Sequence, residues 1–175
     1  MSQFRYVGGD IKPILLPTDP LHPIEEGDLV FRHPANGCAW PAADMANQGT
    51  KALNQDAFQQ YFAGVAMNKV GLQSGEKSFR LMTDPGYVSV ATEGDFSYPC
   101  PSNQYAAGDL VGVFADTNGC ASQEVDTAAS PSLAIGQAKP GVAGVKSAVT
   151  EITVAIRSTL MNPIEAQVAG SGSGQ

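Results

Sequence analysis

Gly27-Asp28-Leu29-Val30 and Asn36-Gly37-Cys38-Ala39 recur later in the chain as Gly108-Asp109-Leu110-Val111 and Asn118-Gly119-Cys120-Ala121. The first tetrapeptide returns 81 residues on, from 27 to 108, and the second 82 residues on, from 36 to 118. A third similarity follows each copy, in Ala63-Gly64-Val65-Ala66 and Ile135-Gly136-Gln137-Ala138. Because the motifs return in one order at nearly one spacing, the sequence predicts a duplicated β unit, at about residues 27–67 and 108–138.

The repeated residues are those of turns and strands. Gly tolerates a positive φ and Asp can hydrogen-bond to nearby backbone, so Gly-Asp predicts a turn that leads into the extended pair Leu-Val. Asn-Gly is a strong hairpin signal, because a two-residue type I′ turn needs a positive φ at both central positions. Each copy is therefore expected to form a strand, a tight turn and a second strand.

Composition limits the classes of partner. The chain of 175 residues has 19 Gly, 12 Pro and only 15% charged residues, which predicts many short elements joined by turns. Its net charge of −7 argues against nucleic acid, because proteins that bind phosphate backbones usually carry a basic stripe. Residues 1–6 lack the cationic start of a secretory signal, and no apolar run approaches the roughly 20 residues that span a bilayer. We therefore expect neither a nucleic acid nor a membrane as partner.

The three cysteines, Cys38, Cys100 and Cys120, have no metal-binding spacing. Cys38 and Cys120 each follow an Asn-Gly pair. Small strand residues that remain reduced are the favoured interpretation, and a disulfide between Cys38 and Cys120 is the alternative.

The two ends of the chain are expected to differ from its centre. Prolines 13, 17, 20 and 23 surround Ile14, Leu15 and Leu16, and proline at this density favours polyproline II or edge-strand geometry. Residues 1–26 are therefore predicted to form an extended arm that packs on its own domain or, as we favour, on a neighbouring chain. Residues 169–175, rich in Gly and Ser, are predicted to be a flexible tail.

One short helix is predicted in residues 42–60, a polar, Ala-rich segment with no counterpart of equal length in the second copy. Leu53, Ala57 and Tyr61 lie four residues apart and therefore share a helical face, as do Phe58 and Phe62. The sequence suggests Asn54 as its N-cap.

The remaining elements are predicted as strands. Residues 149–158 alternate apolar and polar side chains, which is typical of a strand with one face on a core. Asp84-Pro85-Gly86 predicts a hairpin turn between residues 79–82 and 87–92, a further strand is expected over 96–98, and Pro99-Cys100-Pro101 is expected to end it. The sum is a mainly β fold of roughly eight to ten strands, sandwich- or barrel-like, over residues 27–168.

No catalytic or cofactor site is predicted. A catalytic triad would have to use His22 or His33, and each is followed directly by proline. The carboxylates of Glu124 and Asp126 are interpreted as a solvated strand end rather than a glycosidase pair. No glycine-rich segment has the Lys-Ser/Thr of a phosphate-binding loop, and no acidic run has the spacing of a calcium loop. We therefore expect a protein that acts through its surfaces, without enzymatic activity, metal or cofactor.

The order of several β motifs resembles the small β-rich capsid cement or head-decoration proteins of tailed bacteriophages. The resemblance covers about residues 27–158 and rests on 87–96, 107–111, 134–136 and 149–156. It implies a virion protein, made in the host cytoplasm, that lies on the outer surface of an assembled head and ties neighbouring capsid subunits together. It also implies the major capsid protein as partner and self-association as a homotrimer.

On this hypothesis apolar residues of the arm bury against a neighbour by strand addition or groove packing. The candidate interface residues are Phe4, Tyr6, Ile14, Leu15 and Leu16, with the single tryptophan, Trp40, as a further candidate anchor. One alternative is a receptor- or carbohydrate-binding β module of a phage fibre, which predicts exposed aromatic side chains on a concave face. The other is a hydrolase on a β scaffold, which would depend on His33.

Overall fold

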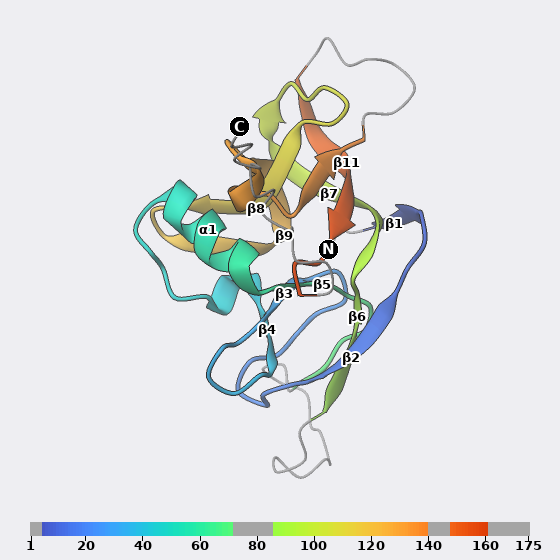
Figure 1. Ribbon diagram of the computed structural model, residues 1–175, viewed down its shortest axis with the longest axis vertical. Helices are drawn as coiled ribbons and strands as arrows, with labels where there is room; N and C mark the ends of the chain where they lie inside the picture. Colours follow the sequence, from blue (N-terminus) through green and yellow to red (C-terminus); the bar gives the residue numbers. More distant parts are fainter. Residues whose placement is uncertain (1–4, 72–85, 140–147, 161–175) are drawn as a thin grey trace, which may run out of the picture.

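The strands of the chain form two antiparallel sheets (Figure 1). The structure, a computed structural model, describes residues 5–71, 86–139 and 148–160. Sheet A has the order β1-β7-β11-β10-β8-β9 and sheet B the order β2-β6-β5-β3-β4. Neither sheet closes into a barrel, and the predicted mainly β, sandwich-like class is confirmed.

The strands are β1 (Arg5–Gly8), β2 (Pro13–Pro17), β3 (Leu29–Arg32), β4 (Ala39–Pro41), β5 (Phe62–Ala66), β6 (Tyr87–Ala91), β7 (Glu93–Asn103), β8 (Leu110–Asp116), β9 (Gly119–Thr127), β10 (Gly136–Ala138) and β11 (Val149–Arg157). The helical elements of the described residues are α1 (Lys51–Tyr61) and two 3₁₀ turns, η1 (Ala42–Asp44) and η2 (Pro131–Leu133).

The duplication extends over almost the whole described chain. The first unit runs β2, β3, β4, α1, β5, β6 and the second β7, β8, β9, η2, β10, β11. Within the sheets, β2-β6-β5-β3-β4 repeats as β7-β11-β10-β8-β9, so each strand of one unit has the same neighbours as its counterpart. The unit is thus larger than the segments 27–67 and 108–138 that the sequence motifs delimit, and β1 is the one strand without a counterpart among the described residues.

The Gly-Asp motif makes the same hydrogen bonds in both units. Asp28 Oδ2 accepts from the backbone N–H of Glu25 at 2.8 Å, and Asp109 Oδ2 accepts from that of Ala106 at 2.7 Å. Gly27 and Gly108 have φ values of +91° and +87°, which only glycine adopts readily. Their N–H groups donate to the carbonyls of Ala66 and Ala138, which fixes β5 and β10 beside β3 and β8.

The third motif supplies a glycine that each unit requires. Gly64 pairs with Val30, and Gly136 pairs with Val111, at equivalent registers. A Cβ on Gly64 would lie 2.1 Å from the carbonyl oxygen of Ala91, and one on Gly136 would lie 2.3 Å from that of Ala155. Both glycines therefore permit the same close approach of two strands.

The hairpin turns differ from the prediction in detail. The first Asn-Gly pair lies between the paired strands β3 and β4, whereas in the second pair Asn118 precedes β9 and Gly119 is its first residue. No described residue other than glycine has a positive φ, however, so Asn36 and Asn118 do not form the predicted type I′ turns. The Asn36 side chain instead accepts from the Cys38 N–H at 3.0 Å, while in the second hairpin the turn residues are Thr117 and Asn118.

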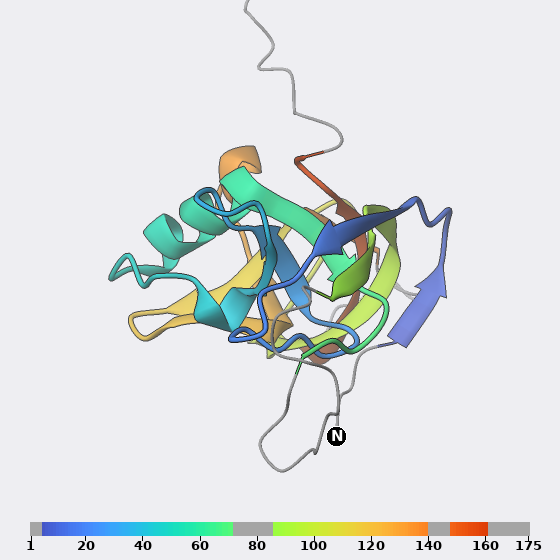
Figure 2. The ribbon, with the colours of Figure 1, turned by 90° about the horizontal axis from the view of Figure 1, so that it is seen from below.

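Helix α1 begins after Thr50, whose Oγ1 accepts from the Leu53 N–H at 3.3 Å. Thr50 is therefore the N-cap in place of the predicted Asn54. Asn54 lies within the helix, on the face that is buried together with Gln55 and Phe58, whereas Leu53 and Tyr61 are exposed. Of the apolar residues predicted to share a helical face, Phe58 and Phe62 are buried in the larger core cluster, whereas Leu53 and Tyr61 are not. The helix stands where the second unit has η2, and Figure 2 shows it on the opposite side of the molecule from β1.

Two apolar clusters lie on opposite faces of sheet B, because alternate residues of a strand point to opposite faces. On β3, Leu29 and Phe31 join the larger cluster, which also contains the inner face of sheet A, while Val30 joins the smaller one. The two edges of sheet B meet at a single bridge between Thr18 and Ala39, so the smaller cluster is enclosed by the curled sheet.

Segments predicted at the ends of the chain have mixed outcomes. Residues 5–26 pack on their own domain, the less favoured of the two predicted alternatives, because the edge strands β1 and β2 pair with β7 and β6 of the same chain. Strand β7 continues through Pro99 and Pro101, which the sequence predicts as its end. As far as Tyr98 the even-numbered residues of β7 bond to β11, so Pro99 lacks an N–H group that would point away from β11, and Pro101 lies where the register between the two strands shifts. Phe4, the turn at 84–86, the strand at 79–82 and the tail at 169–175 lie outside the described residues.

Candidate interaction surface

The predicted interface residues are divided between the two faces of β2. Ile14 and Leu16 are partly buried and pack against the smaller apolar cluster. Leu15 points to the other face, and 69% of it is exposed. On β1, Tyr6 is 40% exposed, with its ring 5.6 Å from that of Phe96. The structure therefore leaves Leu15 and part of Tyr6 accessible.

An aromatic side chain that the sequence did not single out lies on the adjacent strand. Tyr87, at the start of β6, pairs with Pro17 and is 61% exposed. Leu15 pairs with Ser89 two residues further along β6, on the same face. Strands β2 and β6 lie at one edge of sheet B (Figure 1). On the face opposite the smaller apolar cluster, Pro13, Leu15 and Tyr87 are exposed, and together they are called here the β2–β6 surface.

The edge of sheet B beside this surface has few hydrogen-bond donors. The N–H of Thr18 donates to Gly86, and the carbonyl of Lys12 accepts from Thr92. The backbone groups of even-numbered residues on β2 therefore point toward β6, and those of odd-numbered residues point away. Because Pro13 and Pro17 lack N–H groups, Leu15 is the one residue of β2 that offers an outward donor.

Trp40 packs within the fold rather than standing as an anchor. The centroid of its ring lies 3.5 Å from the centroid of the His22 ring and 4.0 Å from that of the His33 ring, and the Trp40 ring is nearly parallel to both. Two imidazoles this close to one indole cannot share a face, so they cover its opposite faces. Phe31, which pairs with Trp40 across β3 and β4, contacts it edge-on at 6.2 Å. Little of either ring face of Trp40 is open to a partner.

Both histidines thus pack on the indole. His22 Nδ1 lies 2.9 Å from Asp44 Oδ2, at the end of η1. His33, on which the hydrolase alternative depends, has its Nδ1 buried with no hydrogen-bond partner among the described residues. No carboxylate orients this nitrogen in the part of the chain that the structure describes.

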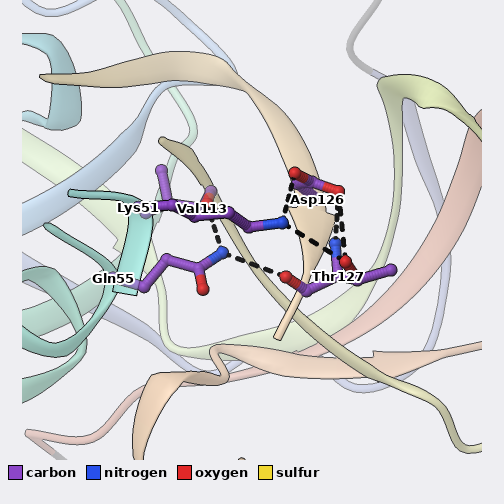
Figure 3. A network of polar contacts seen from close by, with 5 residues as sticks. All are labelled: Lys51, Gln55, Val113, Asp126 and Thr127. Carbon is purple, nitrogen blue, oxygen red and sulfur yellow. Dashed lines mark hydrogen bonds and ion pairs between the residues drawn. The ribbon is translucent and has the colours of Figure 1, made fainter. Parts of the chain in front are cut away.

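Helix α1 is attached to the β8–β9 hairpin by polar side chains (Figure 3). Gln55 Nε2 donates to the carbonyls of Val113 at 2.9 Å and Thr127 at 3.2 Å, and Lys51 pairs with Asp126. Asn54 Nδ2 donates to the carbonyl of Asp116 at 2.8 Å. Apolar periodicity could not reveal this contact, because the buried residues of the helix are mostly polar.

A second polar contact joins the two units near their centre. Gln123 on β9 donates to Asp28 Oδ1 at 2.9 Å, and the Tyr98 hydroxyl donates to the carbonyl of Gly27 at 2.8 Å. Burial raises the pKa of Asp28, while its hydrogen bonds to the Glu25 N–H and to Gln123 lower it. Since the aspartate also shapes the Gly-Asp turn, this contact ties the repeated motif of one unit to the other unit.

The three cysteines are free thiols, and Cys100 is buried.

Across residues 5–71, 86–139 and 148–160, no three His, Cys, Asp or Glu side chains are grouped so as to hold a metal ion. Within the same ranges no helix has the length and apolar character needed to cross a membrane. Glu124 and Asp126 both lie on the edge strand β9. Burial is the main cause that raises the pKa of Glu124, and the negative charge of Asp126 raises it further.

No protein-family model matches the chain, and no curated protein matches it at a significant level.

Proposed function

We propose that this chain is a structural virion protein that binds the outer surface of a tailed-phage head and stabilises its lattice. In this proposal its partner is the major capsid protein, it self-associates as a homotrimer, and its role requires no catalysis. The order of β motifs in the sequence supports this proposal, and the structure adds a surface on which binding can be tested.

The observation that carries the proposal is the β2–β6 surface. Leu15 and Tyr87 are 69% and 61% exposed on neighbouring strands, at the side of the molecule that also holds β1 (Figure 1). Exposed apolar side chains that are contiguous mark surfaces where proteins associate, whereas isolated ones need no explanation. Tyr and Leu in such a position gain free energy when a partner removes them from water.

The experiment compares heads that carry the chain with heads made without it. Heads that lack the chain should release their DNA at a lower temperature, and addition of the purified protein should restore the higher value. Leu15→Ser combined with Tyr87→Ser should prevent this restoration, because both substitutions remove exposed apolar area from the surface.

A matched control is Leu53→Ser. Leu53 is 54% exposed, but it lies on α1, on the opposite side of the molecule from β1 (Figures 1 and 2). This variant should stabilise heads as well as the wild type does. Equal activity of the double variant and the control would contradict the proposed surface, and heads unaffected by the wild-type chain would contradict the function.

A further inference from the structure

The duplication shows which residues of the two units occupy equivalent edge positions. Ile14 pairs with Val90 as Phe96 pairs with Val154. On their other side Val90 pairs with Ala66 and Val154 pairs with Ala138, so the pairings on both sides of β6 and β11 make Ile14 and Phe96 equivalent. The edge of β2 from residue 13 to 15 is therefore equivalent to the edge of β7 from residue 95 to 97.

In the second unit this edge is covered. Strand β1 pairs antiparallel with β7, with Arg5 opposite Ser97 and Tyr6 opposite Phe96. In the first unit, no strand of the described residues lies against the equivalent edge of β2. Sheet A thus has six strands and sheet B has five. The strand that sheet B lacks is the counterpart of β1, which would pair with residues 13–15 of β2.

We propose that the open edge of β2 receives one short extended segment of a partner, which pairs antiparallel with β2 as β1 pairs with β7. This inference rests on the proposed function, so the segment belongs to the protein of the phage shell. Its side chains on the outer face would lie beside Leu15, within the β2–β6 surface.

The backbone groups of the edge define the segment. Pro13 offers only a carbonyl, and Leu15 offers one N–H and one carbonyl, so acceptors outnumber donors. A second copy of β2 could pair with Leu15 only, because its own prolines would stand opposite Pro13 and Pro17 without donors. A segment without proline at these positions satisfies every outward group, which favours a different strand over self-pairing.

The length of the segment is also limited. The bridge between Thr18 and Ala39 brings β4 against the end of β2, so only the first part of the edge is without a neighbouring strand among the described residues. Strand β1, which covers the equivalent edge, has four residues. We therefore expect a segment of similar length, centred on Leu15.

Hydrogen exchange gives a direct test. In the segment Pro13–Pro17 only Ile14, Leu15 and Leu16 have an amide N–H, and those of Ile14 and Leu16 point toward β6. In the free protein the Leu15 amide should exchange rapidly. When the full chain is bound to phage heads made without it, that amide should become protected.

Two variants separate backbone pairing from side-chain packing. Leu15→Ala keeps the N–H and removes most of the side chain, whereas Leu15→Pro removes both and leaves the bonds to β6 intact. Leu15→Pro should bind heads about tenfold more weakly than Leu15→Ala, the effect of one lost hydrogen bond. Thermal unfolding of each variant checks that the fold is kept.

Equal affinities of the two variants, or rapid exchange of the Leu15 amide in the bound protein, would overturn strand pairing while leaving the proposed function in place. Failure of the wild-type chain to bind heads would overturn the proposed function itself.

Discussion

Replacement of Gly64 by alanine tests the duplicated architecture at the position where it is most constrained. A Cβ at this residue would lie 2.1 Å from the carbonyl oxygen of Ala91 and 2.9 Å from Cγ1 of Val90. The nearer atom is backbone, so strands β5 and β6 would have to separate. Gly64 also has a φ of +142°, which a residue with a side chain rarely adopts.

The expected cost combines two effects. Overpacking of a tight core costs about 1–3 kcal/mol, and a strained φ costs about 1–3 kcal/mol more. With roughly 2–4 °C for each kcal/mol in a chain of this size, a loss of about 4 kcal/mol lowers the Tm by about 8–16 °C. The equivalent Gly136 faces the same collision, at 2.3 Å from the carbonyl of Ala155, but without a positive φ. Gly136→Ala should therefore cost about half as much.

Thermal unfolding followed by circular dichroism measures both effects, with Gly8→Ala as the control. Gly8 lies in β1 and does not have a positive φ, and a Cβ added to it would meet no atom within 4 Å. Its replacement should leave the Tm within about 3 °C of the wild type. The reasoning is refuted if Gly64→Ala unfolds at the wild-type temperature, or if the control falls as far as Gly64→Ala does.

Three further results are expected. Gln55→Ala removes the donor to the carbonyls of Val113 and Thr127 and should lower the free energy of unfolding by about 1–3 kcal/mol in denaturant titrations. The control Gln60→Ala, at an exposed position of the same helix, should change that free energy by less than about 0.5 kcal/mol. Equal effects of the two variants would contradict the contact between α1 and the β8–β9 hairpin. Burial raises the pKa of Asp28 in the folded protein, so stability is lost as pH rises through that pKa, and Asp28→Asn should gain stability relative to the wild type as the pH rises above about 4; no such trend in unfolding curves would count against it. Burial likewise raises the thiol pKa of all three cysteines, that of Cys120 to about 11, so alkylation at about pH 8 should be slow in the native protein. Cys100 should react slowest, because it is only 5% exposed and the reagent cannot reach it. All three thiols should react once the protein is denatured without reductant; fewer than three reactive thiols would reveal a disulfide.

The duplication could be predicted from the sequence because its signals depend on the backbone. Gly27, Gly64 and Gly136 serve a turn or a close strand approach, which few other residues allow. The motifs alone delimit too small a unit, however. Strands β2 and β7 correspond in position, but their outward residues share only the proline at the equivalent positions 17 and 99, so the sheet order is needed to reveal their equivalence.

The polar part of the buried face of α1 could not be predicted from apolar periodicity. Asn54 and Gln55 are buried because carbonyls of the β8–β9 hairpin accept their N–H groups. These partners lie far away in the chain, at separations of 62 and 58 residues. Hydrophobic spacing correctly selects Phe58 and Phe62, which are buried, but it also selects Leu53 and Tyr61, which are exposed.

The candidate surface could be predicted in part. The proline density around Leu15 favours polyproline II or edge-strand geometry, and Pro13 and Pro17 do lie in an edge strand, where their missing N–H groups would point outward. The strand that β2 pairs with belongs to the same chain and not to the neighbour that the sequence analysis favours. Tyr87 has the pattern of an ordinary strand residue, since its exposure depends on what covers that face of sheet B. The position of Trp40 between His22 and His33 depends on tertiary packing alone and has no local signal.

The proposed function is tested most directly by counting copies of the chain in purified phage particles. Quantitative mass spectrometry would compare its amount with that of the major capsid protein. A lattice cement protein predicts about one copy per capsid subunit, because every equivalent position of a symmetric shell offers the same site. Only a few copies in each particle would instead indicate a fibre or vertex protein, and absence from particles would contradict the proposal.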